Sequence, residues 1–238
     1  MTDHNIFYIP PASIDGEEIS IRGAELQHIR SALRKRKGEH ITLTDGIGHK
    51  YEAEITACGA GAIFARIVGK ERVARRSKVD ITLGFVPVKG PRNDSIIEKC
   101  TELGVTRFVM FPSARSVVRD MGPRKIERLA KIAQSAMSQS RQCYLPEIRY
   151  VEKFPDVLTT TGKCDHVYVA DPAGQLTIPA TGQSVLVLIG PEGGFTDPEL
   201  DAFAACGVKR MALGSTRLRS ATAAIAAAAK ILAAYGQL

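Results

Sequence analysis

The sequence predicts an α/β protein in two parts, a small β-rich domain followed by a larger domain built on a mostly parallel sheet. Three observations support this. Apolar residues alternate in short runs up to about residue 70, residues 69–78 (GKERVARRSK) are charged without an apolar period, and from residue 79 apolar runs alternate with helical patterns. We therefore expect a linker at 69–78, a first domain over residues 1–72 and a second over 73–238. The 238 residues, 45% of them hydrophobic, are enough for two modest cores.

The first domain is expected to consist of short strands. Residues 41–57 (ITLTDGIGHKYEAEITA) and 61–69 (GAIFARIVG) alternate apolar and polar side chains. Turn residues separate them, at Asp45-Gly46 and at Gly59-Ala60-Gly61.

The second domain begins with a strand within 79–88 (VDITLGFVPV). A helix should follow, capped by Asn93 or Asp94 and ended by Gly104, with one apolar face made by Ile96, Ile97, Cys100 and Leu103. Next come a strand within 105–113 (VTRFVMFPS) and an amphipathic helix at about 123–140. Further strands are expected within the apolar runs HVYVAD (166–171), SVLVLIG (184–190) and VKRMALG (208–214).

Three loops should meet beyond the carboxyl ends of these strands, where open α/β sheets bind ligands: 170–172, 190–194 and 213–220. The middle loop, GPEGG, precedes a helix whose start is predicted by a capping box of Thr196 and Glu199. It matches neither the P-loop pattern nor the dinucleotide fingerprint, and Glu192 would repel a phosphate. The loop therefore favours a neutral or cationic ligand, although glycines needed only for a tight turn remain the alternative. In the third loop, Arg217 and Arg219 precede a helix that Ser220 can cap, which favours an anion nearby.

The composition describes a basic protein without membrane or metal signals. The net charge is +7, and Lys and Arg gather in three clusters that would suit an anionic polymer or, alternatively, form solvated helix faces. No apolar run is long enough for a membrane span and the first residues lack a signal-peptide pattern, so we expect a cytoplasmic protein. The five cysteines and five histidines are scattered without ligand-like spacing, which predicts reduced thiols and no metal. The clusters are Arg30 with Arg34–Lys37; Arg72, Arg75, Arg76 and Lys78; and Arg115, Arg119, Arg124, Lys125 and Arg128.

Six motifs in order resemble one family over nearly the whole chain. They are AELQHIRSALRKRKGEHITLTDGIGHKYEAEI (24–55), KGPRNDSIIEKCTELGV (89–105), SARSVV (113–118), SQSRQCYLPEI (138–148), LIGPEGGFTDPEL (188–200) and LGSTRLRSATA (213–223). In this combination the sequence is similar to the 16S ribosomal RNA uridine N3-methyltransferases of the RsmE type, in the SPOUT superfamily.

The resemblance implies a PUA-like RNA-binding β-barrel over 1–72 and a trefoil-knotted SPOUT methyltransferase domain over 73–238. It also implies S-adenosyl-L-methionine as cofactor, a homodimer, and 16S ribosomal RNA in the small ribosomal subunit as partner. Arg219 is the expected catalytic residue. The cofactor-binding residues implied are Ala170, Asp171, Ile189, Gly190, Pro191, Glu192, Gly193, Gly194, Leu213, Gly214, Leu218 and Thr222. The RNA-binding residues implied are His28, Arg34, Lys35, Arg36, Lys37, Lys89, Arg92, Arg115, Gln139 and Arg141.

The third loop departs from the family pattern L-G-x-R-I-L-R-x-E-T-A. Thr216 and Arg217 stand where the family has Arg-Ile, and Ala221 replaces the glutamate, whereas Arg219 and Thr222 match. Two other functions therefore stay open. One is a SPOUT enzyme that methylates a ribose 2′-hydroxyl, and the other is an RNA-binding ribosome assembly factor that has lost catalysis.

Overall fold

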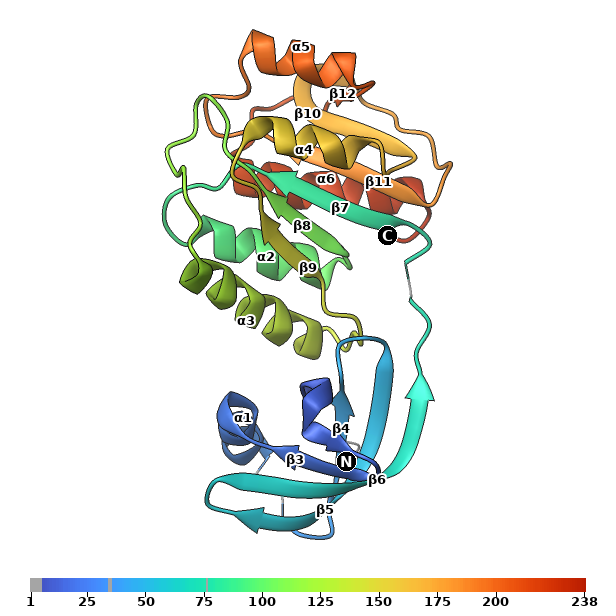
Figure 1. Ribbon diagram of the computed structural model, residues 1–238. Coiled ribbons are helices and arrows are strands. Elements are labelled where there is room, and N and C mark those ends of the chain that lie inside the picture. Colours follow the sequence, from blue (N-terminus) through green and yellow to red (C-terminus); the bar gives the residue numbers. More distant parts are fainter. Residues whose placement is uncertain (1–5, 34–35, 76) are drawn as a thin grey trace. The chain divides into compact units, whose positions relative to one another are not determined.

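The computed structural model describes residues 6–33, 36–75 and 77–238 (Figure 1). By compactness the chain divides into two units, Met1–Arg76 with Met137–Leu145, and Ser77–Ala136 with Pro146–Leu238. The segment 137–145 thus packs with the first unit although it lies far along the chain. The domain boundary predicted at residues 72 and 73 stays a prediction.

The first unit is built on a six-stranded sheet of order β1-β4-β5-β6-β3-β2, in which β1 and β4 are parallel and all other neighbours antiparallel. Its elements are β1 (Ile6–Tyr8), the 3-10 helix η1 (Pro11–Ser13), β2 (Ile14–Asp15), β3 (Glu18–Ile21), α1 (Gly23–Leu33), β4 (His40–Thr44), β5 (His49–Gly59) and β6 (Ala62–Arg72). The alternating runs predicted at 41–57 and 61–69 are confirmed as β4, β5 and β6.

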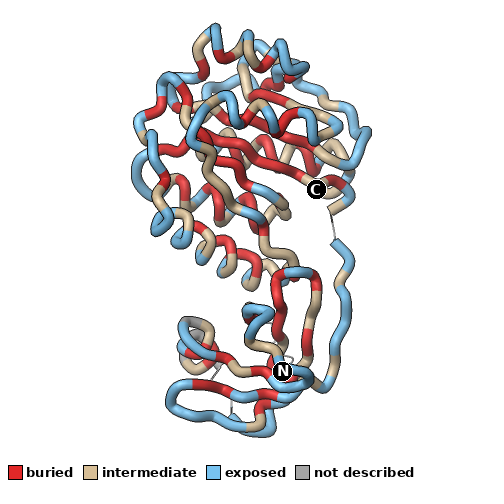
Figure 2. Tube along the Cα trace, in the orientation of Figure 1, coloured by how far each residue is buried: buried red, intermediate tan, exposed pale blue. Residues whose placement is uncertain are grey.

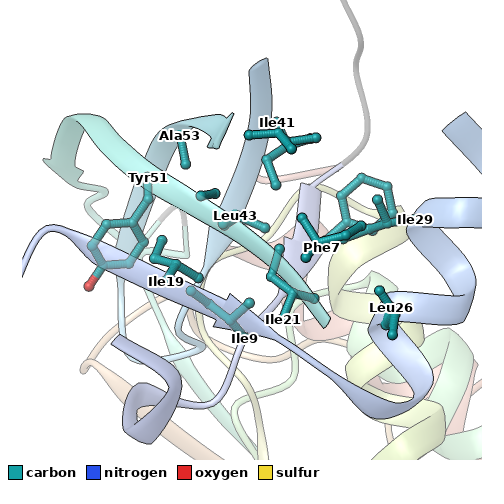
Figure 3. Packing of buried hydrophobic residues seen from close by; sticks show 13 residues of the cluster. Phe7, Ile9, Ile19, Ile21, Leu26, Ile29, Ile41, Leu43, Tyr51 and Ala53 are labelled. Atoms are coloured by element: carbon teal, nitrogen blue, oxygen red, sulfur yellow. The ribbon is translucent and has the colours of Figure 1, made fainter. Parts of the chain in front are cut away.

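The core of this unit explains why α1 escaped prediction. Figure 3 shows the inward side chains of the strands, such as Leu43 and Tyr51, together with Leu26 and Ile29 from α1. These two apolar positions give α1 only a weak helical period. The helix is stabilised by burying them against the sheet, which is a tertiary effect.

The linker predicted at 69–78 is wrong over its first four residues. Gly69–Arg72 continue β6 and pair with β5, and the Lys50 Nζ lies 3.0 Å from Glu71 Oε1. Backbone pairing with a neighbouring strand does not require apolar side chains. The charged composition of residues 69–72 therefore wrongly indicated a linker where β6 continues.

The second unit has a fully parallel sheet of order β12-β10-β11-β7-β8-β9. Its strands are β7 (Asp80–Phe85), β8 (Arg107–Met110), β9 (Glu147–Tyr150), β10 (His166–Gln175), β11 (Ser184–Ile189) and β12 (Lys209–Met211). Its helices are α2 (Arg92–Glu102), α3 (Pro123–Gln139, which continues into the first unit), α4 (Phe154–Thr161), α5 (Asp197–Ala205) and α6 (Ser220–Ala234). The predicted order of strands and helices is confirmed, and β9 and α4 are additional.

Both faces of this sheet are covered, as parallel sheets require. Leu186 and Leu188 of β11 pack with Val157 of α4 and Phe203 of α5, while the alternate residue Val187 is buried on the other face. Helices α2 and α6 pack together, and Figure 1 shows α6 and α4 on opposite sides of the sheet. In Figure 2 the buried residues follow the strands of this sheet, as expected for a sheet covered on both faces.

The cap predicted for α2 is wrong. The helix begins after Pro91, and Asn93 instead accepts a hydrogen bond from Val88 N (3.0 Å) and donates one to Val88 O (2.8 Å). Proline is suited to a helix start because it lacks the N–H that would be unsatisfied there, so the amide is available to fix the loop before the helix.

Two further features concern the whole described chain. Within residues 6–33, 36–75 and 77–238, no helix has the length and apolarity to cross a membrane. All five cysteines are free thiols, and burial raises the pKa of the Cys100 thiol to about 12.

Candidate functional site

The glycine loop, residues 190–194, leaves the carboxyl end of β11 and needs glycine at two positions. A Cβ on Gly190 would lie 3.2 Å from the ring of Phe195, and Gly194 has a φ of +69°. Phe195 is buried and stacks on Phe111, with ring centroids 6.2 Å apart. The ring therefore holds the loop close to the sheet.

Glu199 anchors the far end of this loop. The predicted capping box is confirmed, since Glu199 Oε2 accepts hydrogen bonds from Thr196 N (2.8 Å) and Thr196 Oγ1 (2.9 Å). Its other oxygen accepts the backbone N–H of Ala114 at 2.7 Å. This carboxylate, only 7% exposed, therefore joins the start of α5 to the segment after β8.

The loop after β12 reaches back to the glycine loop. Arg217 Nη2 donates to the Glu192 carbonyl at 3.0 Å, and Ser220 Oγ donates to the Gly190 carbonyl at 3.0 Å. The predicted role of Ser220 as a helix cap is therefore wrong, because the cap position of α6 is Arg219 and the hydroxyl is used between loops. Sequence reasoning identified Glu199 and Ser220 only as caps, and their contacts across the fold have no local signal.

The second half of β10 lies at the same edge of the sheet. Ala212 N donates to Gln175 O at 2.9 Å, and a Cβ on Gly174 would collide with the backbone of Arg210 and Met211. Asp171 Oδ1 accepts the N–H of Ala173 at 2.7 Å, and Ala170 is half-buried. The loop predicted at 170–172 is wrong, because these residues lie within β10, whose pairing with β12 is irregular between Ala170 and Gln175. The loops at 190–194 and 213–220 do meet, and they are directly hydrogen-bonded.

Two arginines from other strand ends contact the glycine loop. Arg92 Nη1 lies 2.7 Å from Glu192 Oε1, and Arg115 Nη1 donates to the Gly193 carbonyl at 2.5 Å. Both were predicted as RNA-binding residues, and this remains a prediction. Their observed contacts show that they also hold the glycine loop in place.

Arg219 lies beside this assembly with its guanidinium uncommitted. It is exposed and has extended backbone dihedrals (φ −73°, ψ 154°). Its carbonyl accepts the N–H of Ala223 at 2.8 Å, whereas its guanidinium makes no hydrogen bond or ion pair with any residue that the structure describes. Thr222 is exposed in the first turn of α6, Gly214 is exposed, and Leu213 and Leu218 are half-buried. A free cation therefore lies next to a loop that presents backbone carbonyls and one carboxylate.

Comparison with known proteins identifies the family and supports the fold. Residues 75–232 match the family of RNA methyltransferase domains, and residues 21–68 match that of RNA methyltransferase PUA domains. The chain belongs to the RNA methyltransferase family. The family resemblance, the α/β class and the PUA-like first part inferred from sequence are thereby confirmed, while the trefoil knot stays a prediction.

Similar proteins extend over nearly the whole chain. It is 29% identical to ribosomal RNA small subunit methyltransferase E of Bacillus subtilis, over 89% of this chain and 88% of the relative. Its structure is similar to that of a ribosomal RNA small subunit methyltransferase E from Neisseria gonorrhoeae bound to S-adenosyl methionine, with TM-score 0.87, 27% identity and coverage of 96% and 97%. It is also similar to a probable rRNA-methyltransferase from Porphyromonas gingivalis, with TM-score 0.83, 30% identity and coverage of 98% of both chains.

The predicted RNA-binding residues of this RNA methyltransferase come from both units. Lys89, Arg92 and Arg115 belong to the second unit, where Arg92 and Arg115 contact the glycine loop. In the first unit Arg36 and Lys37 are exposed, and so are Gln139 and Arg141, the latter with a φ of +57°. Arg34 and Lys35 lie outside the described residues, as does the side chain of His28. No group of three or more metal-ligating side chains occurs among the residues described.

Proposed function

We propose that this chain transfers a methyl group from S-adenosyl-L-methionine to N3 of a uridine in the 16S ribosomal RNA of the small ribosomal subunit. The observation that carries the proposal is the glycine loop at the end of β11, held by Arg217 and Ser220 beside Arg219, whose guanidinium is unpaired among the residues that the structure describes. The names of the related small-subunit methyltransferases and the bound S-adenosyl methionine of the similar structure support it.

The residues at this edge of the sheet fit this cofactor. The glycine loop offers backbone carbonyls and the Glu192 carboxylate, and no lysine of the kind that grips phosphate. S-adenosyl-L-methionine has no phosphate and carries a positive sulfonium, which a carbonyl-rich and acidic loop tolerates. The residues that we propose hold the cofactor are Ala170, Asp171, residues 189–194, Leu213, Gly214, Leu218 and Thr222.

When bound, the cofactor supplies an electrophilic methyl group on its sulfonium. Uracil N3 carries an imide proton that must pass to water or hydroxide before N3 forms its bond to the methyl carbon and the carbon–sulfur bond breaks. Loss of this proton spreads negative charge onto the two uracil carbonyl oxygens. Arg219 is the cation proposed to stabilise that charge where it develops, and interactions of this kind commonly contribute about 100- to 1,000-fold in rate.

The loops also position the reacting groups. Arg217, Ser220 and Arg115 fix the backbone of the glycine loop, so the methyl group can be presented at one place. Holding the nucleophile about 3–3.5 Å from the methyl carbon supplies much of the remaining acceleration. Glu192 is paired with Arg92, and we assign it to holding the loop or cofactor.

The target atom is tested by mass spectrometry of nucleosides. Small subunits from a strain lacking the gene are incubated with the enzyme and cofactor labelled in its methyl group. The proposal expects the label in 3-methyluridine and a reverse-transcription stop at the modified base, because N3 lies on the pairing edge. Label found only in a ribose-methylated nucleoside would establish the 2′-hydroxyl alternative, and no cofactor binding would establish the inactive assembly factor.

The enzyme is further proposed to act as a cytoplasmic homodimer, since ribosomal subunits are assembled there. Helix α6 supports dimerisation, because its partly or fully exposed positions include Thr222, Ala226, Ala229 and Ala233, which allow close approach of a second backbone. Sedimentation of the full chain should give twice the monomer mass of 25.7 kDa at micromolar concentration. A species of 25.7 kDa under those conditions contradicts the dimer.

A further inference from the structure

A pocket of about 290 Å³ opens at the carboxyl end of β7, apart from the cofactor loops. It is lined by residues from the β7–α2 loop, the segment before α3 and the first turns of α3. Its apolar part comprises Val88, Val118, Met121 and Leu129, of which Met121 is 6% and Leu129 is 1% exposed. The volume is near the low end for ligand sites, which are roughly 300–1,000 Å³. It suits a single small ring system.

The rim of the pocket is cationic. It includes Lys89, Lys125 and Arg128. Arg128 is neutralised by Asp94, with Nη1–Oδ2 and Nη2–Oδ1 distances of 2.8 and 2.6 Å. In the described part of the chain, Lys125 Nζ contacts only the backbone carbonyl of Asp120 at 3.2 Å, and Lys89 has no ion-pair partner. Two exposed ammonium groups thus remain to bind an anion above an apolar floor.

The walls of the pocket are fixed before any ligand binds. The Asn93 side chain holds both backbone groups of Val88, and the Arg128–Asp94 pair ties α3 to α2. Gly90 completes the loop with a φ of +77°. A rigid apolar floor with a cationic rim matches a nucleotide, whose base needs an apolar surface and whose phosphate needs a cation.

The pocket is a neighbour of the cofactor loops without being part of them. Arg92, three residues after Lys89, pairs with Glu192 of the glycine loop, and β7 lies next to β11 in the sheet. None of the pocket residues comes from 170–172, 189–194 or 213–222. The reacting base must lie against the methyl group, which the cofactor loops are proposed to hold, so we assign the target itself to those loops and not to this pocket.

We propose that this pocket binds one unpaired nucleotide flanking the target uridine, with its base on Met121, Val118 and Leu129 and its phosphate on Lys89 and Lys125. The inference rests on the proposed function, because it takes the substrate to be RNA. An RNA segment from which a base has been extruded also exposes the faces of the bases beside it, and a second acceptor pocket stabilises that unstacked state. The pocket thereby contributes to the choice of target.

Val118→Phe tests the apolar floor by filling the pocket without changing charge. The matched control is Val117→Phe, since Val117 is the adjacent residue, is 62% exposed and does not line the pocket. Affinity for small subunits lacking the modification should fall about tenfold for Val118→Phe, because the base loses its apolar contacts in the filled pocket, and stay within twofold for Val117→Phe. Cofactor affinity measured by calorimetry should be unchanged in both. Equal effects of the two variants, or none, would overturn the proposal.

Lys125→Ala tests the rim and does not depend on whether the pocket tolerates phenylalanine. Its control is Lys131→Ala on the same helix. Lys131 does not line the pocket, and its Nζ lies 2.9 Å from Glu127 Oε1. The slope of log affinity against log salt should decrease by about one for Lys125→Ala and stay unchanged for Lys131→Ala. Identical slopes contradict binding of a phosphate at this rim.

The same experiments separate this inference from the proposed function. If the wild-type protein binds subunits but leaves no labelled 3-methyluridine, while Val118→Phe still weakens binding more than Val117→Phe does, methyl transfer to N3 is refuted and the nucleotide pocket stands. If labelled 3-methyluridine forms equally with all four variants and RNA affinity is unchanged, the pocket is refuted and the enzymatic function stands.

Discussion

At the scale of single residues, two arginines two positions apart have different tasks. Arg217 is engaged with the Glu192 carbonyl, whereas Arg219 is exposed without a partner among the described residues. The family pattern places an arginine one position before Arg217, and the observed hydrogen bond shows that Arg217 already stabilises the loop. Arg219 is therefore the residue with a side chain available to a substrate.

We expect Arg219→Ala to lower turnover by about 100- to 1,000-fold while cofactor affinity stays within a few-fold, the pattern of an interaction made in the transition state. Arg217→Ala is the matched control and should weaken cofactor binding, because it releases the glycine loop. Single-turnover rates and calorimetry measure the two effects. Equal losses of cofactor affinity and rate in Arg219→Ala would make Arg219 a binding or folding residue instead.

Asp45 is a second informative residue, because its hydrogen bonds set the pKa of its carboxyl group. It is 3% exposed and accepts hydrogen bonds from Ile47 N (3.0 Å), His49 N (3.1 Å), His49 Nδ1 (2.7 Å) and Tyr51 Oη (3.0 Å). Burial raises the pKa of Asp45, but the hydrogen bonds outweigh it and the pKa lies below its ordinary value. Burial, together with the bond to Asp45, raises the pKa of Tyr51 to about 12.

Asp45→Asn should lower the free energy of unfolding by about 1–3 kcal/mol at pH 7, because the amide cannot accept all of these bonds. A carboxyl with a depressed folded-state pKa stabilises the fold above its ordinary pKa, and this contribution is lost as the pH falls through the folded value. The difference in free energy of unfolding between wild type and variant, measured by urea unfolding, should therefore become smaller below about pH 4. A difference that stays constant down to pH 2 contradicts this account. Asp15→Asn, at an exposed position, is the control.

At the scale of elements, the glycine loop takes its shape from the residues on its C-terminal side. Glu199 accepts hydrogen bonds from the start of α5 and from the Ala114 amide. The buried ring of Phe195, just before α5, stacks on Phe111. A loop with exposed glycines at 193 and 194 would otherwise incur a large entropic cost on ordering. The capping box thus stabilises both a helix and the preceding loop.

Glu199→Ala should destabilise the protein by about 1–3 kcal/mol, because it leaves the Ala114 amide and the helix start unpaired. Cofactor affinity should fall as well, since the loop loses its anchor. Asp201→Ala, an exposed change on the same helix, should have little effect on either quantity. Thermal unfolding measures the stability and calorimetry measures the cofactor affinity. Unchanged cofactor affinity in a destabilised Glu199→Ala protein would show that Glu199 caps the helix without anchoring the loop for cofactor binding.

At the scale of the whole molecule, the net charge of +7 is distributed over both units. In the first unit the exposed Arg36 and Lys37 precede β4, and in the second Lys89 and Lys125 lie around the pocket. Charge of this kind binds the phosphate backbone without reading sequence. In the proposed function this charge supplies affinity, while the pocket and the loops supply selectivity.

RNA affinity should accordingly decrease steeply with salt concentration. In the double variant Arg36→Glu, Lys37→Glu, the slope of log affinity against log salt should become less steep, by about one for each phosphate that the protein no longer neutralises. Methylation of small subunits should fall in parallel while cofactor binding stays unchanged. Glu17→Lys and Glu18→Lys, at exposed positions of the same unit, control for the general change in charge. Full methylation by the Arg36→Glu, Lys37→Glu protein would show that the first unit does not bind the substrate through these residues.

The sequence by itself determined most of the strands and helices of the second unit, the capping box and the family, because these depend on local periods and on motifs that are continuous in the chain. It missed α1, β9 and α4, and it placed a loop at 170–172, where β10 continues. It predicted the loops at 190–194 and 213–220 by their position after strands, since the ends of parallel strands share one edge of a sheet. Only the tertiary structure decided that Ser220 bonds to Gly190, that Asn93 holds Val88, that charged residues 69–72 continue β6, and that Lys89 and Lys125 share a pocket. These contacts join residues far apart in sequence or replace a local hydrogen bond by a competing one, so no local pattern encodes them. They exist because packing of the sheet and helices brings the groups within bonding distance.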